Sequence, residues 1–328
     1  MKKLINSPES ALDESLRGFA AAHADIVRLN IDPRFLARAQ ATRPGKVALI
    51  SGGGSGHEPL HGGFVGRGML DAACPGQVFT SPTPDQMLGA AAAVEAGAGV
   101  LFIVKNYAGD VMNFEIAAEM LECATLSVLV HDDVSLPETG GMGRRGVAGT
   151  TIVERIAGAA AEAGADLETC RSIAERVAGQ TASMGVALSS CTVPALGKPT
   201  FDIGDDEIEL GVGIHGERGR ARVRMSSASD IVEQIASTID AALGPGRHPV
   251  LLHVNGFGAT PSMELYVVYE LARRFWESRG TKIVRSLVGN YTTSLDMAGC
   301  SITLSIMDDE LLRLWDSPIH TAALHWGC

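Results

Sequence analysis

The sequence lacks the features that mark a secreted or membrane-spanning protein. No uninterrupted apolar run approaches the length of about 20 residues that crosses a membrane. Glu9, Asp13 and Glu14 interrupt any apolar core that a signal peptide beginning at Met1 would need. The six cysteines are widely spaced and include no C-x-x-C pair, so they favour neither a zinc site nor a disulfide framework. We therefore expect a cytoplasmic protein with reduced thiols.

Basic and aromatic residues are also scarce. The 27 lysines and arginines are outnumbered by 38 aspartates and glutamates, which leaves a formal net charge of -11. The basic residues are scattered, whereas phosphate backbones and anionic membranes are held by clustered Lys and Arg. We therefore expect neither nucleic acid nor a membrane as a partner. Aromatic residues at 5%, with 38 glycines and 46% hydrophobic residues, fit an α/β protein with tight turns.

Strand-like and helical patterns alternate along the chain, which predicts the α/β class. Apolar strands are expected at 46–50 and 99–104, and a helix is expected to begin after Thr83, with Pro84 at its first position. The pattern changes near Met184, where strand-like segments with prolines begin. We therefore expect two α/β domains, 1–183 and 184–328, each a mostly parallel or mixed sheet flanked by helices.

Polar residues follow the first two of these strands. The strand at 46–50 leads into the glycine-rich segment 51–57, which we interpret as a flexible turn ending in His57. The strand at 99–104 leads into Lys105 and then Asp110. In an open α/β sheet, ligands bind outside the carboxyl ends of the strands, so these side chains are expected at one edge of one sheet. Taken singly, Lys105 could be a solvated lysine and Asp110 a helix cap.

Three known motifs fail at the glycine-rich segment. The P-loop would need a glycine at His57 followed by lysine, and the dinucleotide fingerprint lacks its third glycine. Residues 57–61 match the H-E-x-x-H pattern of zinc proteases, but Pro59 lies inside a motif that requires a regular helix. We therefore expect no metal site in this chain.

His215 is the strongest candidate for a reactive group. Residues 207–214 alternate between polar and apolar side chains, which predicts a half-buried strand ending at His215. Gly213 and Gly216 leave the imidazole uncrowded. A structural histidine bonded to a neighbouring carbonyl is the alternative. The basic, glycine-rich loop at 140–146 could contact a phosphate, a partner or nothing.

Five segments together resemble the dihydroxyacetone kinase family, specifically its substrate-binding K subunit. The resemblance covers nearly the whole chain, with the segments in the family's order. The segments are SGGGSGHEP at 51–59, PG at 75–76 with TSPTPD at 80–85, KNYAGD at 105–110, GVGIHGE at 211–217 and TSLDM at 293–297.

The resemblance implies that His215 adds covalently to the ketone carbonyl of a short ketose and forms a hemiaminal. It implies that His57 and Asp110 are an acid/base pair acting on the hydroxyl to be phosphorylated. The positions that contact the substrate in the family correspond here to Gly54, Ser55, Gly56, His57, Lys105 and Asp110.

The resemblance also implies partners. The chain is expected to form a homodimer and to bind no cofactor itself. ATP, or ADP recharged from a phosphoenolpyruvate relay, is expected with Mg²⁺ on a separate nucleotide-binding L subunit. The segment between His215 and Gly256 looks shorter than in other members, so a tetrulose such as erythrulose stands beside dihydroxyacetone as the substrate. A ketose-sensing regulator, which needs His215 but no acid/base pair, is the second functional hypothesis.

Overall fold

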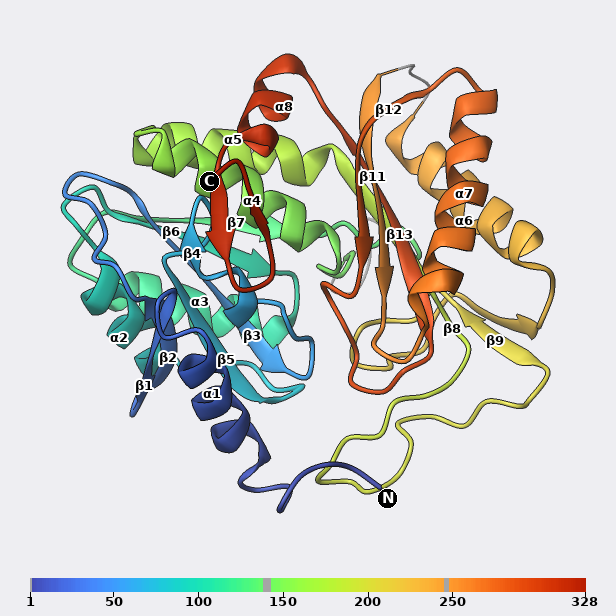
Figure 1. Cartoon of the computed structure of the whole chain (residues 1–328), viewed down its shortest axis with the longest axis horizontal. Helices are drawn as coiled ribbons and strands as arrows, with labels where there is room; N and C mark the ends of the chain where they lie inside the picture. The colour runs from blue at the N-terminus through green and yellow to red at the C-terminus, as the bar shows by residue number, and fades with distance from the viewer. Residues whose placement is uncertain (1, 138–142, 245–247) are drawn as a thin grey trace.

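The computed structural model describes residues 2–137, 143–244 and 248–328. The strands of these residues form two six-stranded sheets and one three-stranded sheet (Figure 1). Helices flank both large sheets, so the predicted α/β class with two mixed sheets is confirmed. Within the described ranges, no helix is both long and apolar enough to span a membrane.

The first sheet combines a parallel core with an antiparallel edge. β5, β3, β6 and β7 pair in parallel, and β1 and β2 join antiparallel on the β5 side. In spatial order the strands are β1 (Val27–Ile31), β2 (Arg34–Arg38), β5 (Ala72–Val78), β3 (Ala48–Ser55), β6 (Val100–Lys105) and β7 (Thr125–Val130). The carboxyl ends of β3 and β6 therefore lie side by side.

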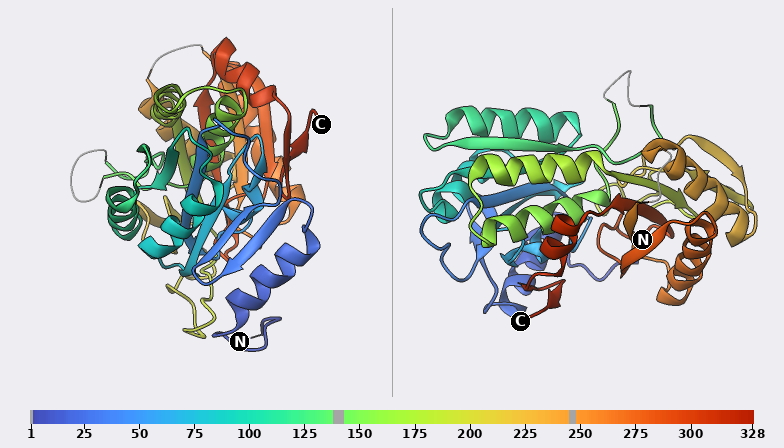
Figure 2. Two further views of the ribbon diagram at one scale, coloured as in Figure 1. Left: turned by 90° about the vertical axis from the view of Figure 1, so that its left-hand side faces the viewer. Right: turned by 90° about the horizontal axis from the view of Figure 1, so that it is seen from above.

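Two pairs of helices cover the two faces of this sheet (Figure 2). Because successive strand residues point to opposite faces, Ile50 of β3 packs towards α2 and α3, whereas Leu49 packs towards α4 and α5. The helices are α2 (Pro84–Val94), α3 (Ala108–Met120), α4 (Gly149–Glu162) and α5 (Leu167–Gly179). As predicted, α2 follows Thr83 and begins with Pro84.

The second sheet is mostly antiparallel, and only β11 and β12 pair in parallel. In spatial order its strands are β10 (Ala221–Arg224), β9 (Glu207–Leu210), β8 (Thr181–Ala187), β13 (Gly299–Ile306), β11 (Pro249–Gly256) and β12 (Lys282–Gly289). Helices α6 (Ala228–Leu243) and α7 (Ser262–Ser278) pack on one face of it. The expected domain division at 183/184 falls within β8 and stays a prediction.

The last part of the chain returns to the first half, where β14 pairs with β4 and α8 packs on α4. Figure 1 shows this red C-terminal segment beside the green helices. The remaining elements are α1 (Ala11–Ala22), the 3₁₀ helix η1 (Gly62–Phe64), β4 (Gly66–Arg67), α8 (Asp309–Asp316), β14 (Ile319–Thr321) and β15 (His325–Trp326).

Helix α4 is buried on all sides, since every residue from Gly149 to Ala161 is buried. It contacts β3 and β6 of the first sheet and also β8 and β13 of the second. Two of its buried residues, Glu154 and Arg155, carry ionisable side chains. Ionisable side chains are almost never fully buried unless they are paired, so each of these needs partners inside the protein.

Gly158 allows α4 to pack against the backbone of the segment before β5. A Cβ at this position would lie 2.4 Å from Met69 Cα and 2.6 Å from Met69 O, which are backbone atoms that cannot rotate away. We expect Gly158→Ala to destabilise the protein by about 1–3 kcal/mol through overpacking. The shift in the urea unfolding midpoint measures this effect.

Gly179→Ala is the matched control, because Gly179, the last residue of α5, is also a helical glycine but a Cβ there would meet nothing within 4 Å. The control is expected to leave stability unchanged or to raise it by about 0.5–1 kcal/mol. Equal midpoints for the two variants would contradict the close packing at Gly158.

Candidate active site

The predicted edge of the first sheet brings His57, Lys105 and Asp110 together. His57 follows β3 by two residues, Lys105 is the last residue of β6, and Asp110 lies in the first turn of α3. All three side chains are buried. This confirms the expectation that the two neighbouring strands deliver these residues to one edge.

The glycine run before His57 is a strand, so the flexible turn expected from the sequence is wrong. β3 continues to Ser55 because the absence of side chains lets other groups approach its backbone. A Cβ on Gly53 would lie 2.1 Å from Lys105 Nζ, and one on Gly54 would lie 2.7 Å from Phe79 Cα. These two glycines make room for the lysine head and for the backbone at Phe79.

His215 lies in a turn, and the prediction of a strand over 207–214 is wrong beyond Leu210. Strand pairing with both neighbours of β9 stops at Leu210, and Gly211 follows with a φ of 76°. A positive φ of this kind breaks an extended strand and is available to glycine at little cost. The turn carries His215 away from the second sheet and towards His57.

Glu217 fixes the His215 ring. The backbone N–H of His215 donates to Glu217 Oε2 at 2.9 Å, and the ring Nδ1 lies 2.8 Å from Glu217 Oε1. Burial raises the pKa of Glu217, but the hydrogen bond from His215 and the charge of Arg145 outweigh burial and lower that pKa to about 2. Because an ionised Glu217 can only accept a hydrogen bond, Nδ1 of His215 carries the proton and donates it in that bond. The lone pair of the neutral ring is therefore on Nε2.

Aromatic rings surround His215 on several sides. His57, Phe79 and Tyr107 place their ring centroids 4.7, 5.2 and 4.6 Å from that of His215, and all three contacts are edge-on. Phe79 and Tyr107 come from the first half of the chain, as His57 does, whereas His215 comes from the second. The candidate site therefore forms only where the two halves meet.

Phe79 and Tyr107 are site residues that were not predicted from the sequence. Phe79 has a φ of 55°, which is uncommon for a residue with a side chain, and it stacks on His57 at 5.0 Å. It lies between two of the segments that carry the family resemblance, at 75–76 and 80–85. Tyr107 lies inside the segment 105–110, which also carries the resemblance. Its position in that segment was the available indication that it belongs to the site.

His57 is held in one tautomer. Its Nδ1 lies 2.8 Å from the backbone carbonyl of Thr293, and because a carbonyl only accepts, Nδ1 carries the proton. Its Nε2 is buried without a hydrogen-bond partner in the described parts of the chain. Burial, followed by the charges of His215 and Lys105, holds the pKa of His57 well below its ordinary value of 6.5. His57 is therefore a neutral acceptor at neutral pH.

We expect His57 to stay neutral in the free protein when the pH falls to about 6, where an unperturbed histidine is largely protonated. A lowered pKa means that the neutral ring persists further into acid. Nitrogen NMR of histidine-labelled protein measures this titration, with His57→Gln used to assign the signal. Protonation of His57 at or above pH 6.5 would contradict the buried environment described above.

Lys105 and Asp110 form a buried pair behind His57. Lys105 Nζ lies 3.5 Å from Asp110 Oδ2 and donates a hydrogen bond of 3.1 Å to the carbonyl of Gly52. The other carboxylate oxygen, Asp110 Oδ1, is buried without a hydrogen-bond partner among the described residues. Lys105 thus compensates the charge of Asp110 while one carboxylate oxygen keeps its accepting capacity.

Three side chains at this site share an unusual property. His57 Nε2, Tyr107 Oη and Asp110 Oδ1 are all buried, and none has a hydrogen-bond partner in the described part of the chain. Leaving a buried polar group unpaired costs about 1–3 kcal/mol, and native proteins pair nearly all of them. A small ligand that carries several hydroxyl groups would satisfy these atoms.

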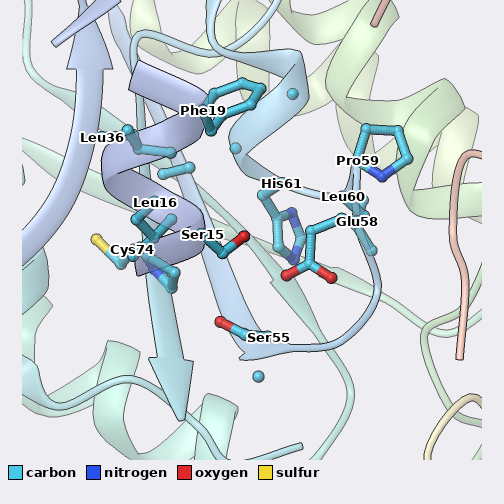
Figure 3. A pocket seen from close by; sticks show the side chains of 16 residues that line it. Ser15, Leu16, Phe19, Leu36, Ser55, Glu58, Pro59, Leu60, His61 and Cys74 are labelled. Carbon is cyan, nitrogen blue, oxygen red and sulfur yellow. The ribbon is translucent and has the colours of Figure 1, made fainter. Parts of the chain in front are cut away.

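A cavity of about 370 Å³ lies on the α1 side of the glycine strand (Figure 3). Gly54 and Ser55 line it, together with Ser15, Glu58 and His61. The lining does not include His57, Lys105, Asp110 or His215. The predicted site residues are therefore split: the acid/base residues gather around His215, while Gly54 and Ser55 also border this separate cavity.

The backbone at Gly56 is already engaged by Glu58. The Gly56 N–H donates to both carboxylate oxygens of Glu58, at 3.0 and 3.1 Å. Gly56 has a φ of 102°, and a Cβ there would lie 2.8 Å from Phe79 Cε1, so only glycine fits. The Ser55 hydroxyl donates to the carbonyl of Gly76 at 2.7 Å. Substrate contacts by Gly54, Ser55 and Gly56 stay predictions.

The H-E-x-x-H segment is a turn rather than the helix that zinc proteases need. Its two histidines have different partners, since His57 bonds to Thr293 and His61 contacts Glu154 and Lys105. Among the described residues, no group of three or more His, Cys, Asp or Glu side chains could hold a metal ion.

Arg145, in the basic loop, reaches the site. Its Nε donates to Asp133 at 2.8 Å, its NH2 donates to the carbonyl of Gly211 at 2.7 Å, and its charge lowers the pKa of Glu217. Residues 140–142 of this loop lie outside the described residues. Through its hydrogen bond to Gly211, Arg145 stabilises the turn that carries His215.

Comparisons with known proteins identify the family of this chain. Residues 17–323 match the model of the Dak1 domain. The chain is 46% identical, over the full length of both chains, to the PEP-dependent dihydroxyacetone kinase, dihydroxyacetone-binding subunit DhaK, of Escherichia coli (strain K12).

Two solved structures extend the comparison. The dihydroxyacetone kinase operon co-activator Dha-DhaQ matches with a TM-score of 0.88 and 33% identity, over 94% of this chain and 96% of the co-activator. The dihydroxyacetone kinase from C. freundii in complex with AMP-PNP and Mg²⁺ matches with a TM-score of 0.86 and 35% identity, over 98% of this chain and 60% of the kinase. The chain belongs to the Dak1 domain family.

Proposed function

We propose that this chain is the substrate-binding subunit of a dihydroxyacetone kinase. The observation that carries the proposal is His215, which Glu217 orients and which lies edge-on to His57 and Tyr107, among buried polar atoms that have no partner in the described structure. The relative from E. coli is named for dihydroxyacetone binding, which supports the same substrate here. A cytoplasmic location, expected from the sequence, is part of this proposal.

The first step is capture of the ketose. The lone pair of His215 Nε2 attacks the carbonyl carbon, a C–N bond forms, and the π electrons of the C=O bond move to oxygen. Glu217, 2.8 Å from Nδ1, receives the proton that the ring must lose and passes it to water, and the former carbonyl oxygen takes up a proton from water, which completes a neutral hemiaminal. A covalent bond supplies affinity and orientation that a three-carbon molecule cannot gain from buried area.

The second step is removal of a proton from the terminal hydroxyl. Asp110 is the base, because its Oδ1 is buried, unpaired among the described residues and able to accept. His57 Nε2 is a second acceptor that assists in placing the hydroxyl. As the hydroxyl oxygen attacks phosphorus, its proton passes to Asp110 and the bond to the leaving group breaks. Phosphoryl transfer also needs neutralisation of the transferred charge.

A partner supplies the phosphoryl donor. The described residues contain no cluster suited to a metal ion, whereas the C. freundii dihydroxyacetone kinase was solved in complex with AMP-PNP and Mg²⁺. We infer that the nucleotide and Mg²⁺ are carried by a nucleotide-binding L subunit, and that this chain binds no cofactor itself. The substrate-binding subunit is further proposed to be a homodimer.

The test is a reconstituted kinase assay. The purified chain is assayed with dihydroxyacetone alone, with ATP, and with a nucleotide-binding subunit supplied with either ATP or a phosphoenolpyruvate relay. Product should form only when the nucleotide-binding subunit is present. Rapid turnover by the lone chain with ATP would contradict the proposal that a separate subunit carries the nucleotide. No turnover with any partner would contradict the kinase proposal itself.

A ketose-sensing regulator is the second candidate, and a specific observation favours it. The co-activator that matches this chain over 94% of its length is named for regulation of a dihydroxyacetone kinase operon. A sensor would capture the ketose on His215 without turnover by any partner.

Running the same reconstituted kinase assay with erythrulose distinguishes a tetrulose kinase from a dihydroxyacetone kinase.

A further inference from the structure

A buried chain of polar side chains runs from helix α4 to Asp110. Its members are Glu154 of α4, His61 of the turn after β3, Lys105 of β6 and Asp110 of α3, and each is almost completely buried. His61 and Glu154 have no role in the reaction outlined above. Burying four ionisable groups is costly unless each is paired, so their arrangement calls for a purpose.

The neighbours of His61 decide which ring nitrogen carries its proton. Lys105 Nζ lies 2.8 Å from His61 Nε2, and an ammonium group can only donate, so Nε2 is the acceptor. Nδ1 must then carry the proton, and it lies beside Glu154 Oε1 and 3.0 Å from Ser51 Oγ. Ser51 gives its own proton to the carbonyl of Ile103 at 2.7 Å, so its oxygen is free to accept from His61.

Burial raises the pKa of Glu154 to about 8, and the positive charge of Lys105 agrees with the assignment of the His61 proton. Burial, followed by the positive charge of Lys105, holds the pKa of His61 well below its ordinary value, so the ring is neutral. A neutral imidazole with one donor and one acceptor matches a neighbourhood of one ammonium and one carboxyl group.

Among the described residues, the ammonium of Lys105 is surrounded by two hydrogen-bond acceptors and one ion-pair partner. They are the carbonyl of Gly52 at 3.1 Å, His61 Nε2 at 2.8 Å and Asp110 Oδ2 at 3.5 Å. A lysine head on a flexible four-carbon stem would otherwise sample many positions. His61 supplies the shortest of the three contacts, and it approaches Lys105 from the turn that also carries His57.

We propose that His61 is a positioning residue for phosphoryl transfer: Glu154 and Ser51 hold its ring so that its Nε2 fixes the Lys105 ammonium against Asp110. Through the contacts from Glu154 to His61 and Lys105, α4, the helix buried between the two sheets, positions the carboxylate of Asp110. The inference rests on the proposed kinase function, because Asp110 is the base only in that reaction.

The test compares two substitutions in the complex with the nucleotide-binding subunit. His61→Leu removes the acceptor, and we expect kcat to fall by about tenfold to a hundredfold, as small displacements of catalytic groups do. His61→Gln can place an amide oxygen near the position of Nε2, and we expect it to keep kcat within about threefold of the parent. Ketose capture on His215, read by carbon NMR, should persist in both.

The outcomes separate the two proposals. If the parent complex shows no turnover, the kinase proposal fails and His61 is not its cause. If the parent turns over and His61→Leu does too at an equal rate, the positioning role is wrong. Equal loss of turnover and of capture in both variants would make His61 merely structural.

A measurement on the parent protein covers the case in which His61→Leu does not fold. Nitrogen NMR of histidine-labelled protein should show His61 neutral and protonated on Nδ1, whatever the activity. The opposite tautomer, or a doubly protonated ring at neutral pH, would overturn the contact with Lys105 and with it the proposal.

Discussion

Replacing Asp110 with asparagine is expected to lower turnover with the nucleotide-binding partner by about 10²–10⁴-fold, the usual contribution of a general base. Asparagine has the shape of aspartate, but its amide cannot take up the proton of the substrate hydroxyl. Asp110 lies at a buried position where Lys105 is its ion-pair partner and where its Oδ1 is unpaired in the described structure. Capture of the ketose on His215 should be largely unchanged.

The measurement is kcat in the reconstituted complex beside carbon NMR of ketose capture. Asp85→Asn is the matched control, since Asp85 also lies in the first turn of a helix but is exposed. The control is expected to behave like the parent. Equal loss of turnover and capture in Asp110→Asn would show that Asp110 is structural.

Replacing His215 with alanine is expected to remove the preference for ketoses over polyols. The parent should use dihydroxyacetone and reject glycerol, because only the ketone offers a carbonyl to His215 Nε2. Without the imidazole, both molecules would be held only by hydrogen bonds, and kcat/KM for dihydroxyacetone should fall by at least about a hundredfold, towards the value for glycerol.

Competition between the two substrates in the reconstituted complex measures this preference. His248→Ala is the control, because His248 is exposed. A His215→Ala enzyme that still prefers dihydroxyacetone strongly would show that the site recognises the ketone by some other group, with Tyr107 the first to examine.

The first sheet and its polar edge were accessible from sequence. The runs before His57 and Lys105 are apolar and short, which indicates buried strands, and parallel strands bring their carboxyl ends to one edge. For this reason the meeting of His57, Lys105 and Asp110 was predicted by a general rule of sheets. The structure confirms it with the pairing of β3 and β6.

The surroundings of His215 were less accessible. Periodicity predicted that Val212 and Ile214 are buried, and they are, but burial continues after the strand has ended. Pattern alone does not separate a buried turn from a strand. Gly211 was the signal, since a glycine with positive φ ends the strand four residues before its predicted end at residue 214.

Contacts between distant parts of the chain could not be read from the sequence at all. Glu154 and His61 are 93 residues apart, and their hydrogen bond depends on how α4 packs between the sheets. The stacking of Phe79 on His57 likewise depends on tertiary packing. Side chains at Gly54 and Gly56 would collide with the backbone and the ring of Phe79. Such contacts are properties of packing rather than of local pattern.

The central claim is that His215 bonds covalently to the ketose, and carbon NMR with dihydroxyacetone labelled at its carbonyl carbon tests it most directly. The spectrum of the parent protein is recorded beside that of His215→Ala. We predict a new protein-bound signal of a tetrahedral carbon in the parent and its absence in the variant. A folded parent protein that gives no such signal, or a signal that persists in His215→Ala, would contradict the claim.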